Sequence, residues 1–167
     1  GKIAYTVSYY SVAENRSTSW IRIAHEQDNQ LVTDHEWVGY EPAWWGNDIA
    51  YLNGGKLYIP NRQSPIANSH TALEGFDKEI EGFLRSPQGD KIILIAQVKT
   101  VANTADKYPD LPLATGRVVD DLMYKHWDEW GTTAPHPFVA DFDGKASSNP
   151  VDIMEGEPFE SPMKPFG

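Results

Sequence analysis

A short segment recurs along the chain, and this repetition constrains the fold more than any other feature. The segment 40–51 begins with an acidic residue and an aromatic cluster, continues through Gly, Asn and Asp, and ends in an apolar run. A version of it returns at 80–94, its first half returns at 159–167, and its second half opens the chain at 1–5. Equivalent positions are similarly spaced, with 46 residues from Ile3 to Ile49, 43 from Ile49 to Ile92 and 40 from Glu41 to Glu81. A period of about 40 to 50 residues predicts a β-propeller or another stacked array.

Each copy of the segment predicts a strand, a turn and a second strand, because turn residues between two apolar runs mark a hairpin. Third strands, with alternating apolar and polar residues, are expected at 19–23, 56–60 and 137–141. Weaker fourth strands are expected at 30–33, 70–73 and 151–154. We therefore expect an all-β fold, an incomplete β-propeller of about three four-stranded blades plus the start of a fourth.

The repeats divide the chain into blades. The expected divisions are 1–33, a blade that lacks its first strand; 34–73; 74–154; and 155–167, the start of the next blade. The first blade would contain a polar connection at 9–18. The third would contain an inserted segment at 101–133, between its second and third strands, and long insertions in regular repeats usually carry function. Because the chain begins and ends within a repeat, it is expected to be a segment of a larger polypeptide.

The inserted segment has two parts. We expect a loop at residues 103–112, because Pro109 and Pro112 disfavour a helix. Residues 117–130 could form a helix with Leu122, His126 and Trp130 on one stripe. We favour an extended strand there, because the start is β-branched and a Gly-Thr-Thr turn follows.

Composition excludes several classes of function. The net charge is 14 − 24 = −10, which disfavours a protein that binds nucleic acid or an anionic membrane surface. There are no cysteines, so disulfides, thiolate zinc sites and a cysteine nucleophile are excluded. No run approaches the roughly 20 apolar residues that cross a bilayer. No cofactor is expected. The start Gly1-Lys2 has no signal peptide and suggests a mature or trimmed N-terminus.

Three stretches resemble a known family. The opening 1–5, the segment 138–144 and above all 122–130, with the sequence Leu-Met-Tyr-Lys-His-Trp-Asp-Glu-Trp, are similar to the β-propeller of the prolyl oligopeptidase family. The most similar branch is the bacterial one of dipeptidyl-peptidase-like and acylaminoacyl-peptidase-like serine peptidases. In that family the propeller restricts entry to a Ser/Asp/His site on an α/β-hydrolase domain. The resemblance covers essentially the whole chain.

The resemblance implies a role but no catalytic residue within this chain. No Gly-x-Ser-x-Gly nucleophile segment occurs in the 167 residues, so the catalytic domain is expected outside it. The expected function is the substrate-gating propeller portion of a serine peptidase that hydrolyses short peptides. Its expected partners are the remaining blades, the hydrolase domain and a peptide substrate. A periplasmic or secreted bacterial location is expected, with the cytoplasm as the alternative. The alternative function is a non-catalytic propeller that binds a protein, cell-wall or carbohydrate partner.

Four carboxylates are the candidate substrate-binding residues. Asp128 and Glu129 lie on the inserted segment, and in related dipeptidyl peptidases acidic residues of a propeller insertion bind the substrate's N-terminus. Glu41 and Glu81, with Glu160 as a third copy, recur at the start of the innermost strands, where a ring of carboxylates would attract an ammonium group. The alternatives are a solvated strand edge for the first pair and strand-end hydrogen bonds for the second.

Two further patterns contain residue types that occur in binding sites. Asp34-His35-Glu36, and His126 with Glu129, are metal-ligand residue types, but side chains at these spacings on a strand point to opposite faces, so no metal site is expected. Four tryptophans could stack on sugars, although core packing is the plainer interpretation: Trp44, Trp45, Trp127 and Trp130.

Overall fold

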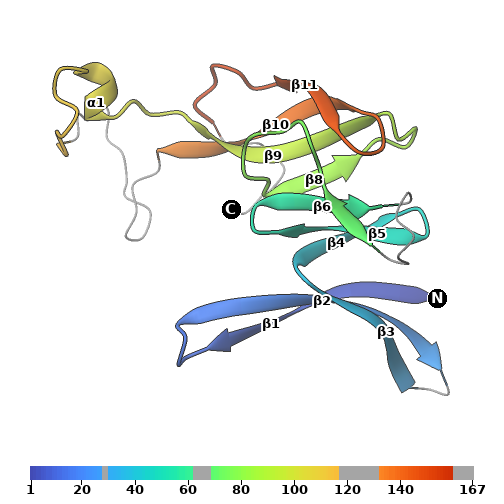
Figure 1. Ribbon diagram of the computed structural model, residues 1–167. Coiled ribbons are helices and arrows are strands. Elements are labelled where there is room, and N and C mark those ends of the chain that lie inside the picture. Colours follow the sequence, from blue (N-terminus) through green and yellow to red (C-terminus); the bar gives the residue numbers. More distant parts are fainter. Residues whose placement is uncertain (28–29, 62–68, 117–131, 160–167) are drawn as a thin grey trace.

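A computed structural model describes residues 1–27, 30–61, 69–116 and 132–159 of the chain. Three antiparallel sheets follow one another in sequence and are stacked face to face (Figure 1). The described part contains one helix, of four residues, so none of its helices could span a membrane. The prediction of an all-β chain of stacked sheets is therefore confirmed.

The first sheet has three strands in the order β1-β2-β3: β1 (Lys2–Ser11), β2 (Arg16–Gln27) and β3 (Gln30–Val38). The prediction of a polar connection at 9–18 is wrong, because β1 and β2 stay paired from Lys2 opposite His25 to Ser11 opposite Arg16. Tyrosine and threonine favour strands even where they are exposed, and this stretch contains Tyr9, Tyr10 and Thr18.

The second sheet has the order β4-β5-β6-β7. Its strands are β4 (Tyr40–Trp45), β5 (Asp48–Asn53), β6 (Lys56–Pro60) and β7 (His70–Ala72). Residues 34–38, which we assigned to this repeat, instead end β3 of the first sheet, so Gly39 alone separates the two sheets. This outer strand tolerates the polar triplet at 34–36 because one of its faces meets water.

The third sheet has the order β8-β9-β10-β11. Its strands are β8 (Gly82–Arg85), β9 (Lys91–Lys99), β10 (Thr133–Phe142) and β11 (Ser147–Asp152). The inserted segment leaves the sheet after β9 and returns at β10, as predicted. The strand predicted at 117–130, with a helix as its alternative, lies outside the described residues.

The insertion begins with a short helix, α1 (Thr104–Lys107), where a loop was predicted. A capping box starts it: the Asn103 side chain accepts a hydrogen bond from the Asp106 amide at 2.8 Å, and the Asp106 carboxylate accepts one from the Asn103 amide at 2.6 Å. Pro109 lies after the last turn, where a proline ends a helix without disrupting it. The predicted loop is therefore wrong for residues 104–107, because the Asn103 cap stabilises one helical turn before the first proline.

Two apolar clusters hold the sheets together, and β5 contributes to both. Its alternate side chains point to opposite faces, so Ile49 and Tyr51 pack toward the first sheet while Ala50 and Leu52 pack toward the third. The larger cluster lies between the second and third sheets and includes Trp45, Leu94, Phe138 and Phe142 among its twelve buried residues. The smaller one joins Ile21 and Ile23 of the first sheet to Ile49 and Tyr51.

Candidate functional site

One end of the stack holds the candidate carboxylates Glu41 and Glu81 and both ends of the inserted segment. The connections β1–β2, β5–β6 and β9–β10 all lie at this end, on the left in Figure 1. We call it the hairpin end. The inserted segment therefore begins and ends here, where Thr100 donates a backbone hydrogen bond to Thr132 at 3.1 Å. Asp128 and Glu129 lie outside the described residues, but the segment that carries them is rooted at the hairpin end.

Glu81 lies beside the root of this insertion. Its backbone amide donates to the carbonyl of Ile95 at 2.8 Å, and this bond places Glu81 one residue before β8. The side-chain amide of Gln97 donates to both carboxylate oxygens, at 3.1 and 2.9 Å. This donor is neutral and the side chain is exposed, so the carboxylate oxygens have lone pairs left for a cationic donor. The strand-end hydrogen bond that was the alternative for Glu81 is present as well.

Glu41 also lies near the hairpin end, in an unusual backbone conformation. Tyr40, its neighbour, pairs with Leu52 one residue from the end of β5. The register shifts between Tyr40 and Ala43, and Glu41 has a φ of 51° in the left-handed region, which costs a residue with a side chain about 1–2 kcal/mol. The side chain is exposed, and none of the described side chains forms a hydrogen bond or ion pair with it. The third copy, Glu160, lies outside the described residues.

A concavity that the sequence did not predict lies under the connection from β7 to β8. It has a volume of about 570 Å³ and is lined by residues of the β5–β6 turn, the end of β7 and the connection itself. Leu57 and Ile80 are buried in its wall, while Asp77 and Glu79 are exposed on its rim. The connecting segment 73–81 carries four acidic residues and one lysine, and this local bias was the signal available in the sequence.

The triplet at 34–36 is arranged for ion pairs within the first sheet. Asp34 pairs with Lys2 at 3.0 Å and with His25 at 2.8 Å, and the hydrogen bond from Lys2 lowers the pKa of Asp34. Glu36 pairs with Arg22 at 2.5 Å, which raises the pKa of that guanidinium. His35 packs against the Trp37 ring. The three side chains thus serve three different contacts.

The tryptophans at 44 and 45 have different environments. Trp45 is buried between the second and third sheets, edge-on to Phe142 with ring centroids 5.6 Å apart. Trp44, on the opposite face of the same edge strand, is 47% exposed. Core packing therefore accounts for Trp45. Trp127 and Trp130 lie outside the described residues.

Comparison with characterised proteins identifies relatives over nearly the whole chain. It is 40% identical to dipeptidyl-peptidase 5 of Porphyromonas gingivalis over 173 aligned residues, covering 99% of this chain and 25% of that protein. It is 34% identical to dipeptidyl-peptidase 5 of Porphyromonas endodontalis, covering 98% of this chain and 24% of that protein. The enzyme of the same name from Aspergillus fumigatus is 27% identical, with 26% of its length covered. The chain thus spans about a quarter of these relatives.

One solved structure shares the fold. The acylaminoacyl peptidase of Pyrococcus horikoshii matches with a TM-score of 0.62 at 11% sequence identity, over 90% of this chain and 23% of that one. No family model matches the sequence. The chain is therefore homologous along almost its whole length to about a quarter of dipeptidyl-peptidase 5, and the resemblance to a segment of dipeptidyl-peptidase-like and acylaminoacyl-peptidase-like proteins is confirmed.

Proposed function

We propose that this chain is the substrate-gating propeller portion of a serine peptidase that hydrolyses short peptides, with the catalytic α/β-hydrolase domain outside the chain. The observation that supports this most is the 40% identity to dipeptidyl-peptidase 5 over 99% of the chain. In this proposal the three sheets are consecutive blades of one propeller, the first lacking its innermost strand. The parent protein is expected outside the bacterial cytoplasm, in the periplasm or secreted.

The role of the hairpin end follows from its charge. Glu81 and Glu41 present exposed carboxylates there, and the insertion that carries Asp128 and Glu129 begins and ends at the same end of the stack. Carboxylates on a low-dielectric wall raise the local concentration of cations, and each can accept a charge-assisted hydrogen bond from an ammonium group. We propose that Asp128 and Glu129 bind the N-terminal ammonium of the peptide, and that Glu41 and Glu81 draw the peptide toward them.

The gating proposal is tested on the full-length parent. Hydrolysis of a dipeptidyl reporter substrate is compared with hydrolysis of the same substrate carrying an acetylated N-terminus, which has no ammonium. Glu129→Gln and Asp128→Asn should each raise KM for the free substrate about tenfold, equivalent to about 1.4 kcal/mol, and leave the acetylated substrate unaffected. Glu81→Gln should have a smaller effect. Glu26→Gln, an exposed change near the opposite end of β2, is the control.

The outcomes separate the two candidate functions. Labelling of the parent by a fluorophosphonate probe, together with peptide hydrolysis, supports a serine peptidase. A parent that neither takes the probe nor cleaves peptides contradicts the proposal and favours a non-catalytic binding propeller. If all the variants hydrolyse the substrate with equal KM values, the proposed peptidase activity stands, but the proposal that these carboxylates bind or attract the substrate's ammonium group is contradicted.

A further inference from the structure

The β1–β2 hairpin is longer than the rest of its sheet. The third strand ends at Val38, which lies opposite Trp20, while β1 and β2 continue as a pair to Ser11 opposite Arg16. Residues 8–19 therefore form a two-stranded arm without a third strand beside it. The arm projects beyond the second sheet at the hairpin end (Figure 1). We call it the β1–β2 arm.

Side-chain contacts give the arm a defined shape. Near the tip the Tyr10 hydroxyl donates to the Asn15 side-chain oxygen, and Arg16 pairs with Glu14 at 2.6 Å. Further along, the Ser8 and Ser19 hydroxyls are 2.8 Å apart across the strand pair. A two-stranded hairpin alone in water is at best marginally stable. These local contacts favour the paired form of the arm and so reduce the ordering cost of a partner's binding.

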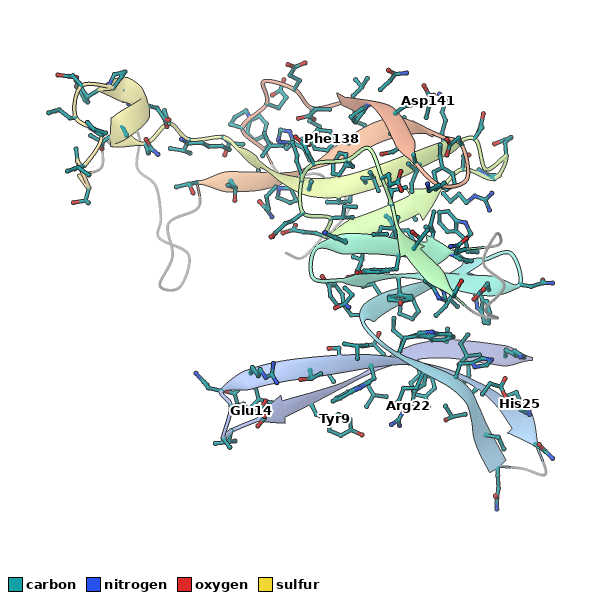
Figure 2. All side chains as sticks on the ribbon, in the orientation of Figure 1. Tyr9, Glu14, Arg22, His25, Phe138 and Asp141 are labelled. Atoms are coloured by element: carbon teal, nitrogen blue, oxygen red, sulfur yellow. The ribbon has the colours of Figure 1, made fainter. Side chains whose placement is uncertain are left out.

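The surface of the arm is aromatic and carries no net charge. Tyr9, Tyr10 and Val12 are 56%, 59% and 85% exposed. Figure 2 shows Glu14 at the tip and Tyr9 part-way along. The twelve residues contain one acid and one base, although the whole chain has a net charge of −10. Exposed tyrosines on an ordered backbone are typical of protein–protein contacts, in which aromatic residues are enriched and charged ones depleted.

We propose that the β1–β2 arm docks on a neutral, partly apolar protein surface supplied by the parent polypeptide outside this chain. The inference rests on the proposed function only in that the chain is part of a longer peptidase. The chain covers 25% of the Porphyromonas gingivalis protein, so that relative is about four times as long. A parent of similar length would contain enough additional polypeptide to form such a surface. Charge attraction would bring a peptide ammonium to the carboxylates at this end, and it would not favour the neutral arm.

Photo-crosslinking in the full-length parent tests the docking. A benzophenone amino acid replaces Val12, and cross-linked peptides are identified by mass spectrometry. The control carries the same group at Asn47, an exposed position in the β4–β5 turn at the other end of the stack. The proposal expects intramolecular cross-links from position 12 to residues outside the chain, and loss of these cross-links with the control.

Hydrogen exchange of the same parent provides a second readout. Val12→Asp places a charge in the proposed contact, and the amides of the cross-linked partner segment should exchange at least about fivefold faster, as expected when one well-packed interface contact is lost. Asn47→Asp should leave them unchanged. Cross-links only to a second copy, only to added peptide, or no more than at position 47 would overturn the proposal. Peptidase activity is measured separately, so a failed docking test with intact hydrolysis rejects the arm's role and leaves the proposed function standing.

Discussion

The two interfaces between the sheets are built differently, although both pack one sheet face against another. Between the second and third sheets, twelve buried residues form a continuous aliphatic and aromatic core. Between the first and second sheets, four buried residues suffice, and Ala4, Trp37 and Tyr58 complete the contact from partly exposed positions. The apolar area removed from water is the main favourable term at such contacts, so the second and third sheets should behave as one unit to which the first is more weakly attached.

The chain segments that connect the sheets also suggest that the first sheet is attached more weakly than the third. Gly39 alone links the first sheet to the second, and a Cβ added there would lie 2.7 Å from the Leu52 carbonyl oxygen. The connection between the second and third sheets is longer and is hydrogen-bonded to both. Ile80 donates to Gly55 at 2.8 Å, and the Ser147 amide donates to the Glu74 carbonyl at 2.8 Å. The larger core is thus reinforced by backbone hydrogen bonds that bridge its two sheets.

The largest expected effect comes from a cavity in the larger core. Leu94→Ala removes a fully buried side chain of β9, and such changes typically cost about 2–5 kcal/mol. Because the core is shared, native-state hydrogen exchange should show lower protection in both β5 and β9 by similar amounts, with less change in β2. The matched control, Leu84→Ala, alters a side chain that is 53% exposed and should have little effect.

The reciprocal variant tests whether the first sheet opens separately. Ile23→Ala should reduce protection in β2 and β3 and leave the β9 amides at their wild-type rates. Equal loss of protection in all three sheets would contradict the division into a larger unit and a more weakly attached sheet.

A second prediction concerns the connection between the second and third sheets. A Cβ at Gly75 would lie 1.9 Å from the Ser147 carbonyl oxygen, whereas one at Gly144 would meet nothing within 4 Å, and both residues have positive φ angles. Gly144→Ala should therefore cost about 1–2 kcal/mol, from the backbone conformation alone. Gly75→Ala should cost about 1–3 kcal/mol more, because the crowding forces the two segments apart. Urea denaturation measures both, and equal losses would show that the contact at Gly75 relaxes freely.

The repeat pattern predicted the second and third sheets well for a physical reason. Their strands are buried on at least one face, so apolar residues recur between Gly, Asn and Asp turns, and this is the signal that periodicity detects. The β1–β2 arm was missed because it is solvated on both faces. Tyr9 and Tyr10 are adjacent, between Ser8 and Ser11, so no alternation of apolar and polar residues marks this stretch. The only trace of a strand was the β-propensity of tyrosine.

The candidate site was predictable in part. The repeat placed Glu41 and Glu81 at the starts of β4 and β8, and the length of the third repeat indicated an insertion, whose root the structure places beside Glu81. The hydrogen bond from Gln97 to Glu81 depends on strand register, and the left-handed backbone of Glu41 depends on a β-bulge. Neither has a sequence signature that would have found it. The concavity under the β7–β8 connection is formed by the β5–β6 turn, the end of β7 and the connection itself. The sequence does not show that these three segments meet in space.

A third prediction concerns a buried polar pair in the third sheet. His136 is almost completely buried on β10, and its Nδ1 lies 2.9 Å from the Asp152 carboxylate on β11. Asp152→Ala would leave this nitrogen without its partner and should cost about 1–3 kcal/mol, with protection lost in β10 and β11. Asp152→Asn keeps an oxygen acceptor and should recover much of that loss. If both variants destabilise the sheet equally, the charge of Asp152 matters more than its geometry.

The smallest expected effect is an acid dependence confined to the first sheet. The hydrogen bond from Lys2, and then the charge of nearby His25, lower the pKa of Asp34 in the folded protein. The folded carboxyl therefore holds its proton more weakly than the unfolded one, whose pKa is about 3.9. The resulting stability is fully present above that value and is lost as the pH falls through the lower folded pKa.

Asp141 in the third sheet provides the matched test, because Lys91 and then Asn149 lower its pKa in the same direction. Hydrogen exchange between pH 5 and pH 3 would be compared for Asp34→Asn and Asp141→Asn. Asp34→Asn should flatten the pH dependence of protection in the first sheet alone, because that sheet is expected to open separately. Asp141→Asn should flatten it across the second and third sheets together. A change in all three sheets with either variant would mean that the smaller apolar cluster couples them as tightly as the larger one does.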